Sequence, residues 1–205
     1  ALGLSNNELV EMAISGAISW HALDIRGRPV FLLALIHGSI DDLRFYLESS
    51  VGDPNAQHLG IPLAGYAISD SCHPKKLETL LEAGADPNAS MYKAGDFFLV
   101  TLSVAHKDLS CFEILIRYGA SLEEAVSRQG FTPYWNAVVY NNAEAIARMY
   151  ELGLDIFHKD SKGFDVLHYA ILMGKSDLVL DVLSRQWDRT RENYSKNRGP
   201  AEKWQ

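Results

Sequence analysis

The sequence predicts an all-α chain built from repeated pairs of helices, and three observations support this fold class. Turn glycines recur at intervals of 33, 35, 35 and 33 residues, at Gly27, Gly60, Gly95, Gly130 and Gly163. Such a period is typical of stacked helical units. Four of these glycines are followed seven residues later by alanine, as at Ala34 and Ala137. Between them, apolar residues recur at helical spacing, as at Leu77, Leu80 and Leu81, so each helix is expected to bury one face.

The unit from Gly130 to Gly163 shows how local signals define each element. Thr132 suits a helix N-cap, because its hydroxyl can accept an orphan backbone N–H. Pro133 suits the first helical position, where no backbone donor is needed. Gly153 suits the left-handed residue that ends a helix. This stretch therefore predicts a helix, a tight turn, a second helix and a loop.

Second helices of the units are predicted wherever the apolar spacing resumes. They are expected over residues 41–47, 75–81, 109–116, 143–150 and 176–183. Residues 8–14 align with such a second helix, and Ser5 with Glu8 has the pattern of a capping box. We therefore expect half a unit before the first full one, either as a natural cap or where a longer array was cut.

The core of the unit is best developed in the segment TPYWNA at residues 132–137, and DVLHYA at 165–170 is a second version. The loop GADPNA at 84–89 recurs in weaker form at 119–121 and 153–155. Five such units in register resemble ankyrin repeats, whose signature is a β-turn, two antiparallel helices and a T-P-L-H-x-A core. The resemblance covers residue 8 to about residue 183, although Pro29, Pro62 and Phe97 replace the usual threonine.

The resemblance implies an ankyrin-repeat solenoid of helix-turn-helix repeats in one body. Its expected divisions are an N-terminal capping half repeat over 1–24, five repeats over 25–56, 57–91, 92–126, 127–159 and 160–186, and a basic C-terminal cap over 187–205. A capping helix is expected over 187–196, because a solenoid must cover its last hydrophobic face.

The composition is that of an ordinary soluble globular protein, with 47% apolar and 22% charged residues and no uncharged apolar window that could span a membrane. Residues 1–184 carry 13 basic and 23 acidic side chains, a net charge of -10, whereas 185–205 carry 6 and 3, a net charge of +3. An acidic body repels phosphate backbones, so we expect neither nucleic acid nor membrane as a partner. A cytoplasmic location is expected, with a secreted or periplasmic one as the alternative if an export signal was removed before Ala1.

Catalytic, cofactor-binding and metal-binding patterns are not found in the sequence. The seven histidines form no HxxxH or HExxH pair, and phosphate-loop and nucleophile motifs are absent. We interpret His168 as a structural residue that bonds neighbouring repeats, Cys111 as a small buried hydrophobe and Cys72 as an inert surface thiol rather than a reactive one. With no CxxC motif, neither a disulfide framework nor a zinc site is expected, and a reducing compartment fits best. The chain is predicted not to be an enzyme and to use no cofactor or metal.

The resemblance implies a partner bound on the concave side, formed by turn tips and by the exposed faces of the first helices. The candidate partner-binding residues at those positions are Arg26, Arg28, His37, His58, Ile61, Asp70, Lys93, Asp96, Arg128, Phe131, Tyr140, Lys162, Phe164 and Met173. Phe131, Tyr140, Phe164 and Met173 are expected to form one exposed apolar cluster, which is typical of an interface. The alternative is that these side chains pack on one another or on the C-terminal tail.

These observations predict a non-catalytic protein-binding scaffold that is a monomer when unbound. Its partner is expected to be another protein with a basic or mixed-charge surface, and neutralisation of a basic toxin by occlusion is one specific hypothesis. A secreted bacterial effector and the recognition fragment of a larger regulator or enzyme are the alternatives. A small-molecule or modification enzyme on the same frame would require a polar pocket, which the sequence does not indicate.

Overall fold

The computed structural model of this chain describes residues 4–91 and 97–184 of 205. Over these ranges the protein is helix-rich, and its strands are two short antiparallel pairs. This content is compatible with the predicted all-α class. None of the helices in the described ranges is long and apolar enough to cross a membrane. The expected C-terminal capping helix over 187–196 lies outside the described residues.

The helices in chain order are α1 (Asn6–Ile14), α2 (Val30–Ile36), α3 (Ile40–Glu48), α4 (Leu63–Ser69), α5 (Pro74–Glu82), α6 (Leu99–Ser103), α7 (Ser110–Arg117), α8 (Pro133–Val139), α9 (Ala143–Glu151) and α10 (Val166–Leu172). Residues 176–184 are also helical. The strands are β1 (Gln57–His58), β2 (Ile61–Pro62), β3 (Ser90–Met91) and β4 (Phe97–Phe98). β1 pairs with β2 and β3 pairs with β4, so each pair forms a short ladder just before a helix.

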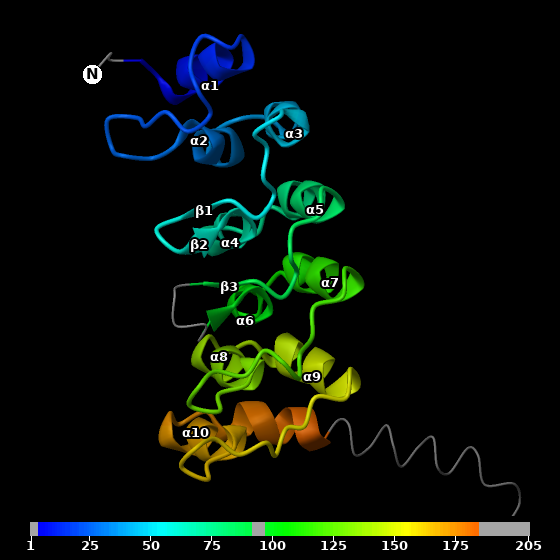
Figure 1. Cartoon of the computed structure of the whole chain (residues 1–205). Helices are drawn as coiled ribbons and strands as arrows, with labels where there is room; N and C mark the ends of the chain where they lie inside the picture. Colours follow the sequence, from blue (N-terminus) through cyan, green and yellow to red (C-terminus); the bar gives the residue numbers. More distant parts are fainter. Residues whose placement is uncertain (1–3, 92–96, 185–205) are drawn as a thin grey trace, which may run out of the picture.

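Successive helices pack in pairs, and the pairs lie one below another (Figure 1). α2 packs on α3, α4 on α5, α6 on α7 and α8 on α9. The first helices α2, α4, α6, α8 and α10 also contact one another in sequence, as do the second helices α3, α5 and α7. The β1–β2 hairpin lies on the side of the first helices, on the left in Figure 1. We call each helix pair, with the loop that leads into it, a layer.

Small side chains allow the first helices to pack closely. Ala34, Ala67, Ala137 and Ala170 are all buried, with at most 1% of each residue exposed. These are the alanines that follow the turn glycines at seven residues. Because alanine has almost no side chain, the backbones of neighbouring first helices can approach one another at these points. Leucines, isoleucines and valines from both helices of each layer fill the remaining core.

Helix ends follow most of the local signals. Ser5 and Glu8 form both hydrogen bonds of the predicted capping box of α1. Gly153 has φ 89 after α9, as expected for a left-handed end residue. Thr132 is the N-cap of α8, but its side chain makes no capping hydrogen bond, so that part of the prediction is wrong. Pro133 follows at the first helical position, where it removes one of the orphan donors that a cap would satisfy.

The second helices agree closely with their predicted ranges. α3, α5, α7 and α9 each begin and end within one residue of the ranges predicted from apolar spacing. Their buried stripes contain the residues that defined the pattern, such as Leu77 and Leu80 on α5. The apolar period therefore predicted these helices because the buried face fixes both their length and their orientation.

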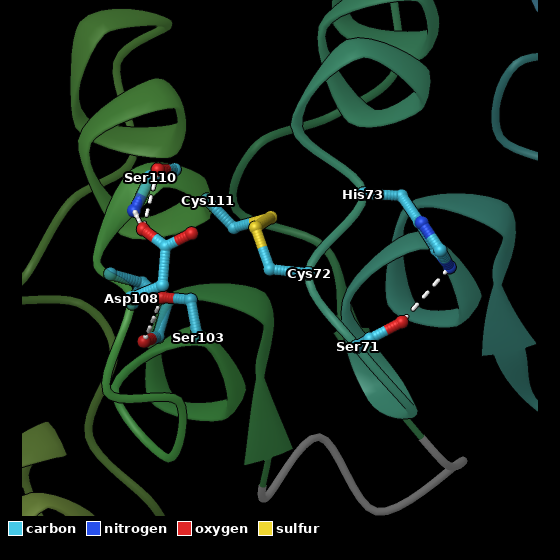
Figure 2. Close-up of a disulfide and its surroundings, with 8 residues drawn as sticks. Ser71, Cys72, His73, Ser103, Asp108, Ser110 and Cys111 are labelled. Atoms are coloured by element: carbon cyan, nitrogen blue, oxygen red, sulfur yellow. Dashed lines mark hydrogen bonds between the residues drawn. A yellow bond between two sulfur atoms is a disulfide. The ribbon is translucent and has the colours of Figure 1, made fainter.

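The two cysteines form a disulfide, which corrects the expectation of two separate thiols (Figure 2). Cys72, in the loop before α5, is bonded to Cys111 in the first turn of α7, and their Cα atoms are 5.9 Å apart. The two residues are 39 positions apart, and packing of α5 on α7 brings them together. Cys72 is thus neither a reactive nor an inert surface thiol, and the argument for a reducing compartment loses its basis.

Candidate binding surface

Asp24 shapes the turn tip at the N-terminal end of the stack. Its Oδ1 accepts hydrogen bonds from the backbone N–H groups of Arg26 and Arg28, both at 2.8 Å. Its Oδ2 pairs with Nη2 of Arg28 at 2.7 Å and accepts from Nε at 2.8 Å. Burial raises the pKa of Asp24, but the hydrogen bonds from Arg28 and Arg26 outweigh it and hold that pKa below its usual value. Arg28 is therefore half-buried and neutralised, whereas Arg26 is exposed.

His37, the C-cap of α2, lies beside this tip. Burial, and then the positive charges of Arg28 and Lys76, lower the pKa of the His37 imidazole. A neutral imidazole can accept a hydrogen bond, and Nη1 of Arg28 lies 3.4 Å from His37 Nε2. The structure therefore brings three predicted site residues together at this end: Arg26, Arg28 and His37.

The middle candidates are spread along the stack. His58 and Ile61 face each other as partners in the β1–β2 ladder, and both are half-buried. Asp70 is the exposed C-cap of α4, at the opposite end of that helix from the ladder. Lys93 and Asp96 lie outside the described residues. Nothing in the described geometry joins these middle candidates into a single site.

Two predicted phenylalanines meet around Tyr169 at the far tips. Phe131 stacks on Trp135 with ring centroids 5.1 Å apart and meets Tyr169 edge-on at 5.5 Å. Phe164 stacks on His168 at 5.4 Å and meets Tyr169 edge-on at 5.9 Å. We call these five residues the aromatic patch. Trp135 and Tyr169 were not predicted as site residues; an aromatic ring four residues after each tip phenylalanine, at Trp135 and His168, was the available signal.

Asp160 holds the aromatic patch in place. Its Oδ1 accepts from the backbone N–H groups of Lys162 and Phe164 at 2.8 and 2.9 Å, and its Oδ2 accepts from the phenol of Tyr169. The bond from Tyr169 is the main cause that lowers the pKa of Asp160, and the same bond raises the pKa of Tyr169 to about 12. One buried carboxylate thus fixes both the turn tip and the ring at the centre of the patch.

The structure divides the apolar cluster expected from the sequence. Tyr140 and Met173 are the C-caps of α8 and α10, whereas Phe131 and Phe164 precede the N-termini of the same helices. Each helix has seven residues, which separates the two groups by about 10 Å. Tyr140 is 54% exposed and Met173 is 39% exposed, and neighbouring Leu172 is 71% exposed. They form a second exposed apolar group beside the aromatic patch.

The remaining predicted residues flank the patch. Arg128 and Lys162 are exposed on the two tips that carry the phenylalanines. His168 was expected to bond neighbouring repeats, but its Nδ1 lies 2.7 Å from Oδ1 of Asp165, the N-cap of its own helix. It takes this partner because His168 is the N3 residue of a capping box, in which its side chain points back to the N-cap residue Asp165. Over residues 4–91 and 97–184, no group of three or more His, Cys, Asp or Glu side chains is placed to hold a metal ion.

Comparison with known proteins gives a partial match to a bacterial transferase. No protein-family model matches the chain. The chain is 23% identical over 176 residues to phosphocholine transferase AnkX of Legionella pneumophila, a match that covers 84% of this chain and 18% of that protein. The prediction that the chain is not an enzyme is contradicted by this finding, because the similar protein is a transferase.

Proposed function

We propose that this chain is a protein-recognition scaffold of the ankyrin-repeat type, in which each layer is one repeat and the turn tips contact the partner. The observation that carries the proposal is the aromatic patch, where rings from two successive tips meet around Tyr169.

Equivalent asparagines bridge successive layers in the same way, which supports a repeat architecture. Asn55 Nδ2 donates to the carbonyl of Gly84 at 3.2 Å, and its Oδ1 accepts from the backbone N–H of Asp86 at 2.8 Å. One layer further, Asn88 bonds the carbonyl of Gly119 at 3.3 Å and the N–H two residues beyond it at 2.7 Å. A side chain that makes the same two bonds in consecutive layers is expected where the layers are copies of one unit.

A second bridge recurs at the start of the second helices. Lys76 Nζ donates to two carbonyls at the end of α2, at 2.5 and 2.9 Å, and Lys175 Nζ donates to two at the end of α8, at 2.9 and 2.7 Å. Asn142 Nδ2 does the same after α6, at 2.9 and 2.7 Å. The last carbonyls of a helix have no partner within it. The next layer supplies the missing donors, which supports a stack that is stabilised from neighbour to neighbour.

The aromatic patch has the properties of a binding surface. Aromatic residues are enriched among the residues that dominate binding energy at interfaces. Phe164 is 38% exposed, yet its backbone N–H is held by Asp160 at 2.9 Å, and its ring stacks on His168 and meets Tyr169 edge-on. A side chain held in place before binding loses less conformational entropy when the complex forms. Tyr140 and Leu172 extend the exposed apolar surface along α8 and α10.

Charge around the patch favours a partner of mixed charge. Arg128 and Lys162 stand on the same tips as the phenylalanines, although residues 1–184 have a net charge of -10. A partner with an apolar centre and carboxylates beside it would complement the patch and its basic tips, and basic groups further out would complement the acidic body. The more specific hypothesis, that the partner is a toxin which this chain neutralises, rests on the sequence alone.

A second candidate function is substrate recognition within a larger transferase. The comparison with phosphocholine transferase AnkX favours it, because the matched region is 18% of that protein. In this version, the aromatic patch holds a protein substrate while residues elsewhere in a longer protein carry the chemistry. The partner protein would then be chemically modified as well as bound.

The test uses affinity capture from the native lysate with the intact natural protein and two variants. Phe164→Ala removes an exposed ring of the patch, and Leu59→Ala removes a side chain that is 80% exposed on another tip. One partner should be lost with Phe164→Ala and kept with Leu59→Ala. Equal capture by both variants would refute the placement of the site. Mass spectrometry of the captured partner for an added phosphocholine group separates the second candidate from simple binding.

A further inference from the structure

A groove of about 570 Å³ lies at the N-terminal end of the stack, between α1 and the loop before α2. One part of its lining is apolar: Leu9 and Met12 come from α1, and Ile18, Leu23 and Ile25 come from the loop. Leu23 is 66% exposed and Ile25 is 75% exposed. The volume is in the range of about 300–1,000 Å³ that is typical of ligand clefts.

One end of the groove is positively charged. Arg26, Arg28 and His37 line it together with the apolar residues. Asp24 neutralises Arg28 through contacts of 2.7 and 2.8 Å, so Arg26 is the uncompensated charge. Among the residues that the structure describes, the Arg26 guanidinium has no hydrogen-bond or ion-pair partner. An exposed guanidinium beside an apolar wall is suited to a ligand that is both apolar and anionic.

We infer that this groove binds a peptide segment of a partner protein in which an apolar side chain is followed by a carboxylate. The apolar side chain leaves water against Ile18, Leu23 and Ile25, which is favourable in proportion to the area buried. The carboxylate meets the planar guanidinium of Arg26, whose geometry matches it with two parallel hydrogen bonds. A free inorganic anion would use the charge but leave the apolar walls exposed.

Charge complementarity favours an acidic segment at this place in particular. The body from residue 1 to 184 has a net charge of -10 and repels anions over most of its surface. The lining of the groove holds two arginines, Arg26 and Arg28, against one carboxylate, Asp24, while the Glu8 carboxylate at its edge is bonded to Ser5 at 2.7 and 2.8 Å. Leu23 and Ile25 of the lining are exposed, so a segment of a partner can reach them. An acidic segment of a partner would therefore be directed to this end.

The groove is independent of the aromatic patch. It is formed by α1 and the loop before α2, whereas the patch lies by α8 and α10, and Figure 1 shows α1 and α10 at opposite ends of the stack. A substitution that abolishes binding at one surface should therefore leave binding at the other unchanged. The inference goes beyond the proposed function by adding a second site and naming the chemistry of its ligand.

The experiment measures binding of a short fluorescein-labelled peptide of alternating leucine and glutamate by fluorescence anisotropy, with the intact chain. A matched peptide has glutamine in place of glutamate. Arg26→Gln should weaken binding of the acidic peptide about tenfold, as expected for loss of a charge-assisted pair, and should leave the glutamine peptide unaffected. Ile25→Ser should weaken both peptides.

Two variants serve as matched controls. Arg44→Gln removes an arginine whose side chain is 54% exposed on α3, and Leu59→Ser removes a leucine 80% exposed on another tip. Both should bind like the unsubstituted chain, and all four variants should melt alike because the substituted residues are exposed. Equal binding of the two peptides, or no effect of Arg26→Gln, would overturn the inference. Binding to phosphatidylserine vesicles that depends on Ile25, without peptide binding, would also overturn it and assign the groove to a lipid surface.

Discussion

Reduction of the Cys72–Cys111 disulfide should lower the free energy of unfolding by about 4 kcal/mol, from the entropy of the closed loop. The bond closes a loop of 39 residues that includes α5, β3, β4 and α6. In the chain-entropy relation, a loop of this length gives a stabilisation between about 3 kcal/mol for a short loop and about 5 kcal/mol for one of a hundred residues. Folded domains are stable by about 5–15 kcal/mol, so the loss would be a large part of the total.

The assay is urea unfolding followed by circular dichroism, with and without a phosphine reductant. The reduced protein should unfold at a lower urea concentration. The variant Cys72→Ala, Cys111→Ala should unfold at the same urea concentration whether or not reductant is present, which controls for effects of the reductant itself. Detection of two free thiols by a thiol reagent in the protein that has not been reduced would refute the reasoning. An unchanged urea midpoint after reduction would refute it as well.

Three further predictions concern the layers and the patch. The pKa of Tyr169 is about 12 in the folded protein against 10.0 for the free side chain. Because the phenol ionises at lower pH in the unfolded state, the free energy of unfolding should fall as pH rises from 10 to 12. Tyr169→Phe should flatten that part of a plot of the urea midpoint against pH. Lys175→Met removes the donor to two carbonyls of α8 and should cost about 1–3 kcal/mol in urea unfolding, whereas Lys75→Met, on α5, serves as the control and should cost little. Ala137→Glu places an unpaired charge at a position with 0% exposure, so the thermal midpoint should fall sharply, and unchanged melting would contradict the stacking of the first helices.

The helices were predictable from the sequence because their information is local. Apolar residues at i, i+3 and i+4 located the second helices, as at Leu77 and Leu80, and turn glycines marked the layers. The alanines seven residues after the glycines marked the repeated unit in the sequence, and all four are buried. The positions of the helices follow from the short-range spacing of apolar residues, and a single sequence contains all of that information.

The disulfide and the joined rings were not predictable, because they depend on contacts between distant residues. Cys72 and Cys111 meet only once α5 packs on α7. Tyr169 joins two phenylalanines from successive tips, and its orientation depends on its bond to Asp160. Asp160 stands three residues before Gly163, as Asp24 does before Gly27, but no local pattern in the sequence indicates that its carboxylate bonds Tyr169.

Burial also changes how the candidate site should be probed. Phe131 is packed between Trp135 and Tyr169, so its truncation would disturb the patch as well as any contact with a partner. Tyr140 is 54% exposed and Phe164 is 38% exposed, and removing them alters mainly the accessible surface. These two positions therefore separate loss of binding from loss of structure.

The central claim is that the exposed rings at the far tips and helix ends bind a partner protein. The most direct measurement is calorimetric titration of the purified, captured partner into the unsubstituted chain and into the Phe164→Ala, Tyr140→Ala variant, with Leu59→Ala as the control. The account predicts that the double variant loses about 2 kcal/mol of binding free energy or more, while the control binds normally. Equal affinity of the double variant and the unsubstituted chain would contradict it.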